Sequence, residues 1–261
     1  MEKLWKYSAN GNHFVLLDGL RGSAAPDAKR VQSLCHPAFG VGADGVAHIS
    51  AGDTPHAFRF RLWNSDGGEA EMCGNAARAA AWHFFQHHAP EQSSLTFRTM
   101  NGVYEARREG ERLWVKMTEK KADLRPDPAL FAAYSHYFYL NTGVPHLVLE
   151  VPDVDKLNLN AQAAPWRHHF IFPRGTNVDF ITRVDAETVK LRVFERGVEG
   201  ETWSCGTGVA AVAWAAREFY GPRETLTVRT KGGDHRVRWD AEGALWYSGD
   251  VKLVFTAESA I

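Results

Sequence analysis

The stretch EMCGNAARAAAWHFF, from Glu71 to Phe85, decides how the rest of the chain is interpreted. It places Cys73 directly before an alanine-rich run that begins at Gly74 and predicts a helix. The first turn of a helix carries unpaired backbone N–H groups and the positive end of the helix dipole, and both favour an anion. We therefore expect Cys73 to be poised as a reactive thiolate.

A second stretch repeats this pattern. SCGTGVAAVAWAAREFY, residues 204–220, sets a small residue, Cys205, a glycine and a polar residue before another alanine-rich helix. The cysteines are 205 − 73 = 132 positions apart in a chain of 261 residues, which is the spacing expected of a duplicated domain. Helices that are small and apolar nearly all round are buried, so we expect one central helix in each half.

Short strand-like segments fill the rest of both halves. FRFRLWN at 58–64 alternates strictly, and SLTFRT, GVYEARR and RLWVKM are typical of antiparallel strands separated by Asn-Gly and Glu-Gly turns. Further segments of this kind stand before and after the second helix. We expect an N-terminal half at 1–120, joined by a C-terminal strand at about 251–261, and a second half at 121–250.

Composition narrows the class of partner. The net charge is −1 and no block of like charge occurs, so nothing indicates a nucleic-acid groove or an anionic membrane surface. No apolar stretch is long enough to cross a bilayer. Three cysteines make a poor disulfide framework and no signal peptide is recognisable, so a cytoplasmic protein that acts on a small molecule is expected. The sequence leaves the oligomeric state open, and a homodimer is compatible with it.

Two thiols that face one another across a cleft could invert a stereocentre. One, as thiolate, removes a proton from carbon, and the other returns a proton to the opposite face. Backbone N–H groups around Gly74, Asn75, Gly206 and Thr207 could hold the substrate carboxylate and spread the developing negative charge. Such a reaction needs no pyridoxal phosphate and no metal.

Other residues with reactive side chains have plainer interpretations. Cys35 is expected to be a buried small apolar residue. The adjacent pairs His87–His88 and His168–His169 lack the spacing of metal ligands, so no metal site and no cofactor are expected. The glycines near the cysteines are not accompanied by a phosphate-binding lysine or a dinucleotide motif.

Several motifs together resemble the diaminopimelate epimerase family, of the cofactor-independent two-cysteine type, from one end of the chain to the other. They are GNHFV at 11–15, GVGADG at 40–45, WNSDGGEAEMCGNAAR at 63–78, NTGVPHLV at 141–148, NVDF at 177–180 and FERGVEGETWSCGTG at 194–208. The resemblance implies an α+β fold of two pseudo-symmetric halves, each a mostly antiparallel sheet rolled around a central helix. It also implies interconversion of LL- and meso-diaminopimelate, for lysine and peptidoglycan precursor synthesis.

The resemblance also implies roles for individual residues. Cys73 and Cys205 match the acid and base pair, and His146 and Glu195 match positions that hydrogen-bond near the thiols. Substrate-holding positions of the family match Asn12, Asn64, Asn177 and Arg196, the last three chiefly at the distal, non-reacting centre. An arginine suits a carboxylate because its forked donors bind two oxygens at once.

The chain departs from the family pattern at Val144, where an asparagine that contacts the distal carboxylate is common. The run between Glu195 and Cys205 is one residue longer, and His13 and Ala76 replace an acidic residue and a glycine. An epimerase of another amino acid, such as histidine or hydroxyproline, therefore stays an alternative. A further alternative is a binding module or an isomerase related to phenazine-biosynthesis enzymes, although the retained cysteine pair counts against it.

Overall fold

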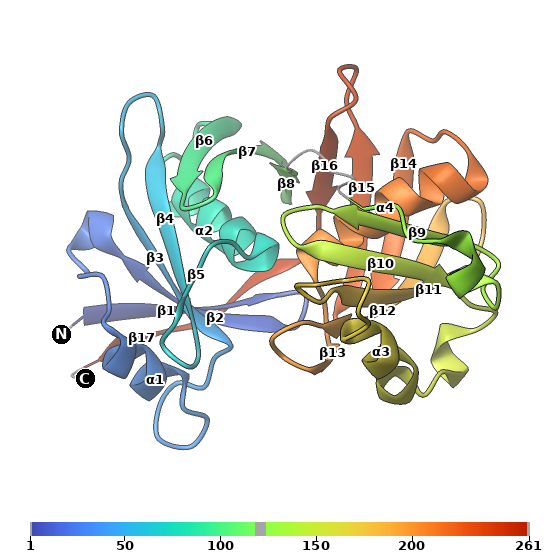
Figure 1. The fold of residues 1–261 in the computed structure, drawn as a ribbon. Helices are drawn as coiled ribbons and strands as arrows, with labels where there is room; N and C mark the ends of the chain where they lie inside the picture. Colours follow the sequence, from blue (N-terminus) through green and yellow to red (C-terminus); the bar gives the residue numbers. More distant parts are fainter. Residues whose placement is uncertain (1, 118–123, 260–261) are drawn as a thin grey trace. The chain divides into compact units, whose positions relative to one another are not determined.

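The computed structural model describes residues 2–117 and 124–259. The chain divides into two compact units (Figure 1). Unit 1 consists of Met1–Lys116 and Gly249–Ile261, and unit 2 of Met117–Ser248. The boundary that the sequence predicts at 120/121 lies outside the described residues.

The strands of unit 1 pair in the order β17-β1-β2-β3-β4-β6-β7-β8, with β5 added to β4. Two of the pairs, β2–β3 and β4–β6, are parallel and the others are antiparallel. The strands are β1 (Glu2–Ala9), β2 (Asn12–Asp18), β3 (Gly45–Ala51), β4 (Phe58–Asn64), β5 (Glu69–Ala70), β6 (Ser94–Thr99), β7 (Gly102–Glu109), β8 (Arg112–Lys116) and β17 (Val251–Ser259).

Unit 2 repeats the topology of β1–β8 and has no counterpart of β17 among the described residues. Its order is β9-β10-β11-β12-β14-β15-β16, with β13 added to β12. The parallel pairs are β10–β11 and β12–β14, which correspond to β2–β3 and β4–β6 of unit 1. The strands are β9 (Tyr137–Asn141), β10 (Pro145–Glu150), β11 (Asn177–Arg183), β12 (Thr188–Glu195), β13 (Gly200–Thr202), β14 (Thr225–Thr230), β15 (Gly233–Trp239) and β16 (Leu245–Ser248). The predicted α+β class is confirmed.

One long helix lies inside each sheet (Figure 1). In unit 1, α2 (Gly74–His87) contacts strands β1, β2, β3, β4, β7, β8 and β17. In unit 2, α4 (Gly206–Tyr220) contacts β9, β10, β11, β12, β14, β15 and β16. Their alanines are at most 1% exposed, because a methyl side chain lets strands approach the helix on most sides. Both helices begin where the sequence predicts.

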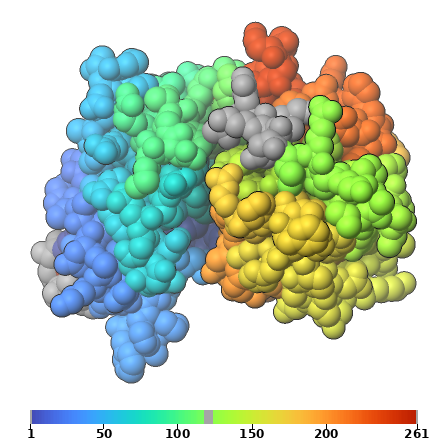
Figure 2. Space-filling view, viewed as in Figure 1, coloured from blue at the N-terminus to red at the C-terminus, as the bar shows by residue number. Residues whose placement is uncertain are grey.

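The shorter helices were not expected from the sequence. Within residues 2–117 and 124–259 they are α1 (Ala28–Cys35), α3 (Leu159–Arg167) and three 3-10 turns, η1 (Gly19–Arg21), η2 (Pro128–Phe131) and η3 (Val154–Lys156). Asp27 caps α1 by accepting a hydrogen bond from the N–H of Arg30 at 2.8 Å. Cys35 is buried against Val31 and Leu34, and burial raises the pKa of its thiol to about 11. The loop that follows α1 protrudes from the surface and exposes Phe39 (Figure 2).

The last strand returns to the first. β17 pairs antiparallel with β1, from Glu2 opposite Ser259 to Ala9 opposite Val251. Arg78 of α2 is fully buried and donates to Asn10 Oδ1 at 2.6 Å and to the carbonyl oxygen of Asp250 at 3.3 Å. The central helix of unit 1 is therefore bonded to the beginning of the C-terminal strand.

Membrane insertion through a helix has no support in the described residues, where none of the helices is both long and apolar enough to span a bilayer.

Candidate active site

Cys73 is the residue that caps the N-terminus of α2. Its backbone is extended, with φ −140° and ψ 120°, and its carbonyl oxygen accepts the first helical hydrogen bond from Ala77 at 2.9 Å. The residue is half-buried. The sequence predicts this cap position correctly, and it sets the cysteine beside the N–H groups of the first turn, to which the helix itself offers no carbonyl acceptor.

Two predicted substrate residues of unit 1 lie together beside this cap. The side-chain amide of Asn75, which is fully buried, donates to Asn12 Oδ1 at 2.6 Å. Asn12 begins β2, and its own Nδ2 donates to Asp44 Oδ2 at 3.3 Å. The pair therefore connects the first turn of α2 with the start of a neighbouring strand.

Asn64 is the last residue of β4 and is exposed. Its N–H donates to the carbonyl oxygen of Gly68 at 2.9 Å, which closes the turn that leads back through β5 to Cys73. Gly67 in this turn has φ +89°, and a Cβ there would lie 2.8 Å from the carbonyl oxygen of Ala28. Only glycine fits this position without strain.

Cys205 occupies the same cap position on α4, with φ −125° and ψ 113°. It is 7% exposed, and its Sγ lies 3.2 Å from the hydroxyl oxygen of Thr207. Burial, together with the nearby carboxylates of Glu195 and Asp179, raises the pKa of this thiol well above its ordinary value. Cys205 is therefore held as the protonated thiol, which is the proton-donating form.

Predicted residues of unit 2 meet around His146, which is fully buried on β10. Its Nε2 lies 3.0 Å from Thr207 Oγ1 and 3.2 Å from Asn177 Nδ2, and its Nδ1 lies 2.6 Å from Asp179 Oδ2. The parallel register sets His146 opposite Asn177, the first residue of β11. This arrangement brings the NTGVPHLV motif at 141–148 and the NVDF motif at 177–180 to one place.

Asp179 was not among the residues predicted from the sequence. It is fully buried, although a carboxylate rarely is unless it is paired. The signal was available, because residues two apart on a strand share a face and Asp179 follows Asn177 by two positions.

Glu195 and Arg196 lie where β12 turns into β13. Glu195 Oε2 accepts from the hydroxyl of Thr202 at 2.9 Å, and the backbone N–H of Arg196 donates to Asn177 Oδ1 at 2.6 Å. The Arg196 guanidinium donates to the carbonyl oxygen of Arg174 at 3.0 Å. The longer run RGVEG forms a hairpin in which Glu199 takes a left-handed conformation, with φ +56°.

Gly208 allows a close approach beside Cys205. A Cβ at this position would lie 2.8 Å from Asp179 Oδ1 and 3.4 Å from both Cys205 Cβ and His146 Cε1. Contacts under 3.0 Å force something to move, so the third residue after Cys205 has to be glycine for the cluster to keep this geometry. We count Gly208 with the candidate site, a role the sequence alone did not assign to it.

A separate cluster in unit 1 has donor atoms that metals use. Asp18 Oδ2 lies 3.1 Å from His83 Nε2 and 2.8 Å from His88 Nε2, and the three donor atoms lie within 4.8 Å of one another. The sequence does not predict this grouping, because Asp18 lies far along the chain from the two histidines. The guanidinium of Arg21 lies 3.4 Å from the same Asp18 oxygen, so a positive charge already stands where a cation would bind.

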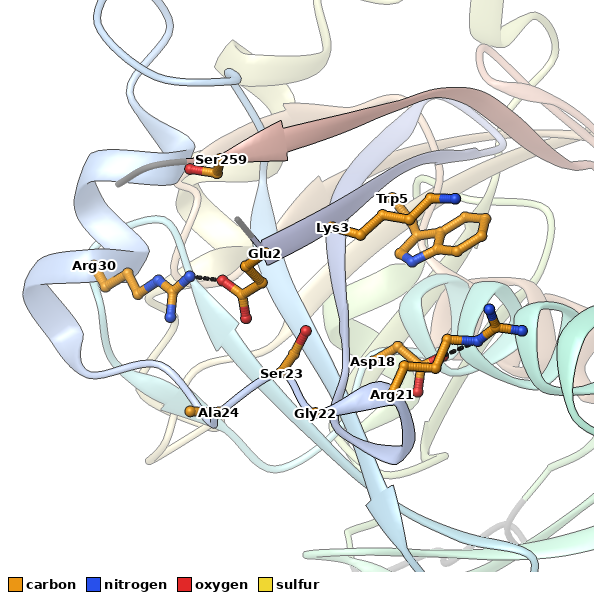
Figure 3. A pocket seen from close by; sticks show the side chains of 10 residues that line it. All are labelled: Glu2, Lys3, Trp5, Asp18, Arg21, Gly22, Ser23, Ala24, Arg30 and Ser259. Carbon is orange, nitrogen blue, oxygen red and sulfur yellow. Dashed lines mark ion pairs between the residues drawn. The ribbon is translucent and has the colours of Figure 1, made fainter.

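The same aspartate borders a cavity of about 710 Å³ in unit 1 (Figure 3). Two ion pairs are drawn there, Arg21 with Asp18 and Arg30 with Glu2. None of the residues predicted to bind substrate lines this cavity. The candidate active site therefore stays with the two cysteine caps and their neighbours.

Known proteins resemble this chain over most of its length. The family model for diaminopimelate epimerase matches residues 4–124 and 138–254. A diaminopimelate epimerase from Archaeoglobus fulgidus is 35% identical over 267 residues, covering 96% of this chain and 93% of that protein. One from Methanothrix thermoacetophila is 36% identical over 255 residues, covering 92% and 89%.

Solved structures share the fold at low sequence identity. A predicted epimerase from Pseudomonas aeruginosa has a TM-score of 0.73 at 16% identity, with both chains fully covered. A hydroxyproline epimerase from Agrobacterium vitis has a TM-score of 0.66 at 14% identity, covering 98% of this chain and 91% of that one. Since the matching model spans most of the sequence and close relatives cover nearly all of it, the chain belongs to the diaminopimelate epimerase family of isomerases.

Proposed function

We propose that this protein interconverts LL- and meso-diaminopimelate by moving a proton at one α-carbon, without a cofactor. The observation that carries the proposal is the repeated cap: in each unit a cysteine stands directly before the buried central helix. Relatives that share about a third of the sequence over nearly the full chain are diaminopimelate epimerases.

In this mechanism Cys73 and Cys205 are the two bases, each serving one face of the α-carbon. The state of Cys205 supports the donor half of the cycle, because its raised pKa keeps the sulfur protonated. The other thiol then acts as thiolate and takes the substrate proton. When the substrate is the opposite isomer, the roles exchange.

Backbone N–H groups of the two helix N-termini would hold the reacting carboxylate. The N–H groups of Gly74, Asn75, Gly206 and Thr207 belong to first turns, where no helical carbonyl accepts from them. Charge that develops on the carboxylate during proton removal is stabilised by such donors. Asn12, Asn64, Asn177 and Arg196 are proposed to hold the rest of the substrate, and His146 and Glu195 to control the protonation of Cys205.

The test is NMR of α-proton exchange in D₂O, with reduced protein and LL-diaminopimelate as substrate. Exchange accompanied by formation of the meso isomer is expected. The matched control is Cys35→Ala, which removes a buried cysteine outside both caps and should leave the rate unchanged.

The substrate panel should include histidine, proline and hydroxyproline. Val144 stands in the turn between β9 and β10, where its carbonyl oxygen accepts from Thr142 at 3.2 Å, and its side chain offers no polar group to a distal carboxylate. Exchange of another amino acid without exchange of diaminopimelate would retain the two-thiol chemistry and overturn the proposed substrate. A protein that exchanges none of them is not an epimerase of this kind.

Free thiols also suggest where the protein works. We propose a reducing compartment, the cytoplasm, because oxidation of either cap cysteine would remove a base. Activity should then depend on reductant. A homodimer stays a prediction, which sedimentation of the purified protein would test.

A further inference from the structure

The orientation of one side-chain amide fixes the proton on His146. The backbone N–H of Arg196 can only donate, and it donates to Asn177 at 2.6 Å, so the acceptor must be the amide oxygen Oδ1. The other end of the amide, Nδ2, then faces His146 Nε2 at 3.2 Å. An NH₂ group has only protons to offer, so Nε2 has to be the unprotonated ring nitrogen.

The opposite ring nitrogen agrees with this assignment. If Nε2 carries the lone pair in the neutral ring, Nδ1 carries the hydrogen, and Nδ1 lies 2.6 Å from Asp179 Oδ2. A carboxylate is an acceptor only, so the Nδ1–H bond to Asp179 is satisfied. Both residues are fully buried, which removes competition from water.

The lone pair on Nε2 then has a second neighbour. Thr207 Oγ1 lies 3.0 Å from Nε2, and the same hydroxyl oxygen lies 3.2 Å from Cys205 Sγ. The hydroxyl can donate to Nε2 and accept from the S–H group of Cys205 at the same time. An unbroken line of hydrogen bonds thus joins the thiol to the buried carboxylate.

We propose that Asp179 is a positioning residue for the epimerisation: it holds His146 with Nε2 facing Thr207, so that the ring can store the proton of the Cys205 thiol. The inference rests on the proposed function only for its consequence in catalysis. The orientation of the ring and the state of the thiol can be measured without any substrate.

The transfer is balanced and involves no redox change. The S–H bond of Cys205 breaks as its proton moves to Thr207 Oγ1, and the proton that Thr207 carried moves to His146 Nε2. The products are a thiolate, an intact threonine hydroxyl and an imidazolium ion, whose Nε2–H donates to Thr207 Oγ1 and replaces the hydrogen bond that the neutral ring accepts from Asn177 Nδ2. The Asp179 carboxylate stabilises that imidazolium through the Nδ1–H bond.

Asp179 acts on the thiol in two opposite ways. Its negative charge, like that of Glu195, opposes a thiolate at Cys205 directly. Through His146 it favours the thiolate, and we take this effect to be the larger because the carboxylate hydrogen-bonds the ring directly at 2.6 Å, whereas it makes no hydrogen bond to the sulfur and acts on it only through its charge. The two effects give opposite predictions for a variant without the charge.

The decisive measurement is the thiolate absorbance of Cys205 as a function of pH, in a Cys35→Ser, Cys73→Ser background with Cys205→Ser as the blank. With Asp179→Asn, the thiolate should appear about one pH unit higher than with the parent. A shift to lower pH, or none, would overturn the inference, since the loss of a negative charge alone favours the thiolate.

Two further variants separate the line of hydrogen bonds from general damage. Thr207→Val breaks the line and should raise the pH of thiolate formation as Asp179→Asn does, whereas Thr207→Ser keeps a hydroxyl and should restore the parent value. Thr182→Val is the matched control on β11: it loses the bonds of the Thr182 hydroxyl to Val151 and Val154, outside the His146 cluster, and should not shift the titration.

Nitrogen NMR of the unmutated protein observes the ring directly, and a variant is needed only to assign its signal. The His146 signal, assigned by its loss in His146→Gln, should report a protonated Nδ1 and an unprotonated Nε2. A protonated Nε2 in the neutral ring would overturn the inference. With active protein, Asp179→Asn should lower kcat at least about tenfold and change KM little; if the substrate is wrong, the titration and the NMR result still stand.

Discussion

The two cysteine caps have the same backbone and different chemistry around them. Two residues after Cys73, Asn75 bonds to Asn12 at the start of β2; two residues after Cys205, Thr207 bonds to His146 at the start of β10. The strands β2 and β10 hold equivalent places in the two sheets. A duplicated fold therefore carries an amide pair at one cap and a hydroxyl–imidazole pair at the other.

The difference means that the two thiols have neighbours with different acid–base properties, although the backbone around them is alike. Side-chain amides position neighbouring groups but do not take up or release protons near neutral pH, whereas an imidazole does. The imidazole hydrogen-bonds to Asp179, which is fully buried, whereas Asn12 hydrogen-bonds to Asp44, which is exposed. The proposed proton storage therefore belongs to unit 2.

The largest expected effect comes from removing either thiol. Cys73→Ala and Cys205→Ala should each lower the rate of inversion by about 10²–10⁴-fold, because each removes an acid or a base. Each variant should still exchange the α-proton of one isomer in D₂O, and the two should differ in which isomer. Inversion at the full rate in either variant would mean that the two caps do not act as a pair.

A second prediction concerns the third residue after each cysteine, which is Gly208 in one unit and Ala76 in the other. Gly208→Ala forces a methyl group against Asp179 and should cost about 1–3 kcal/mol in the free energy of unfolding, with loss of activity. Ala76→Gly leaves a flexible residue in a buried helix, should cost about 1 kcal/mol and should spare turnover. Urea titrations and initial rates measure both; equal activity in the two variants would show that the caps tolerate the same side chains.

The buried Asp–His pairs of the two units should separate stability from catalysis. Burial raises the pKa of Asp18, but hydrogen bonds from His83 and His88 outweigh it and lower the pKa from 3.8 to about 2. A lowered pKa stabilises the fold above pH 3.8, and this contribution of about 2 kcal/mol is lost as the pH falls through 3.8 towards 2.

Asp18→Asn should therefore lower the free energy of unfolding by about 2 kcal/mol near pH 7 and flatten its dependence on pH in the acid range. Turnover of the folded enzyme should not change. Acid unfolding followed by circular dichroism is the measurement, and a kcat that falls as far as in Asp179→Asn would mean that the two pairs share a function.

The smallest effect is expected from metal removal. Arg21 supplies the positive charge beside Asp18, and the cap residues include no set of metal ligands among the described parts of the chain. Dialysis against a chelator should leave both the melting temperature and the rate unchanged. A drop in melting temperature reversed by zinc would show instead that Asp18, His83 and His88 hold a metal ion.

The sequence predicts the parts of this molecule that depend on local chemistry. The small, apolar runs after Cys73 and Cys205 indicate buried helices, and the strict alternation of FRFRLWN indicates β4, because in each case the periodicity lies within one element. The repeat of the cysteine motif predicts two similar halves. The short helix α1 was missed because its eight residues give a weak pattern that Asp27 alone marks.

The contacts around His146 could not be predicted in the same way. They depend on the parallel register of β10 with β11, which joins residues 31 positions apart, and on the first turn of α4. Nothing in the local sequence distinguishes Asp179 from a surface aspartate, and only the fold shows that it is fully buried and hydrogen-bonded to the His146 ring. The Asp18 cluster was missed for the same reason, since its aspartate and histidines come from different elements.

The pairing of β17 with β1 has a consequence for how the protein is made. A ribosome delivers β1 first and β17 last, so unit 2 can fold while unit 1 still lacks an edge strand and the partner of Arg78 at Asp250. Until then one edge of β1 is open to pairing with another chain. A nascent chain in which β17 has not yet emerged therefore exposes a strand edge that the finished protein covers.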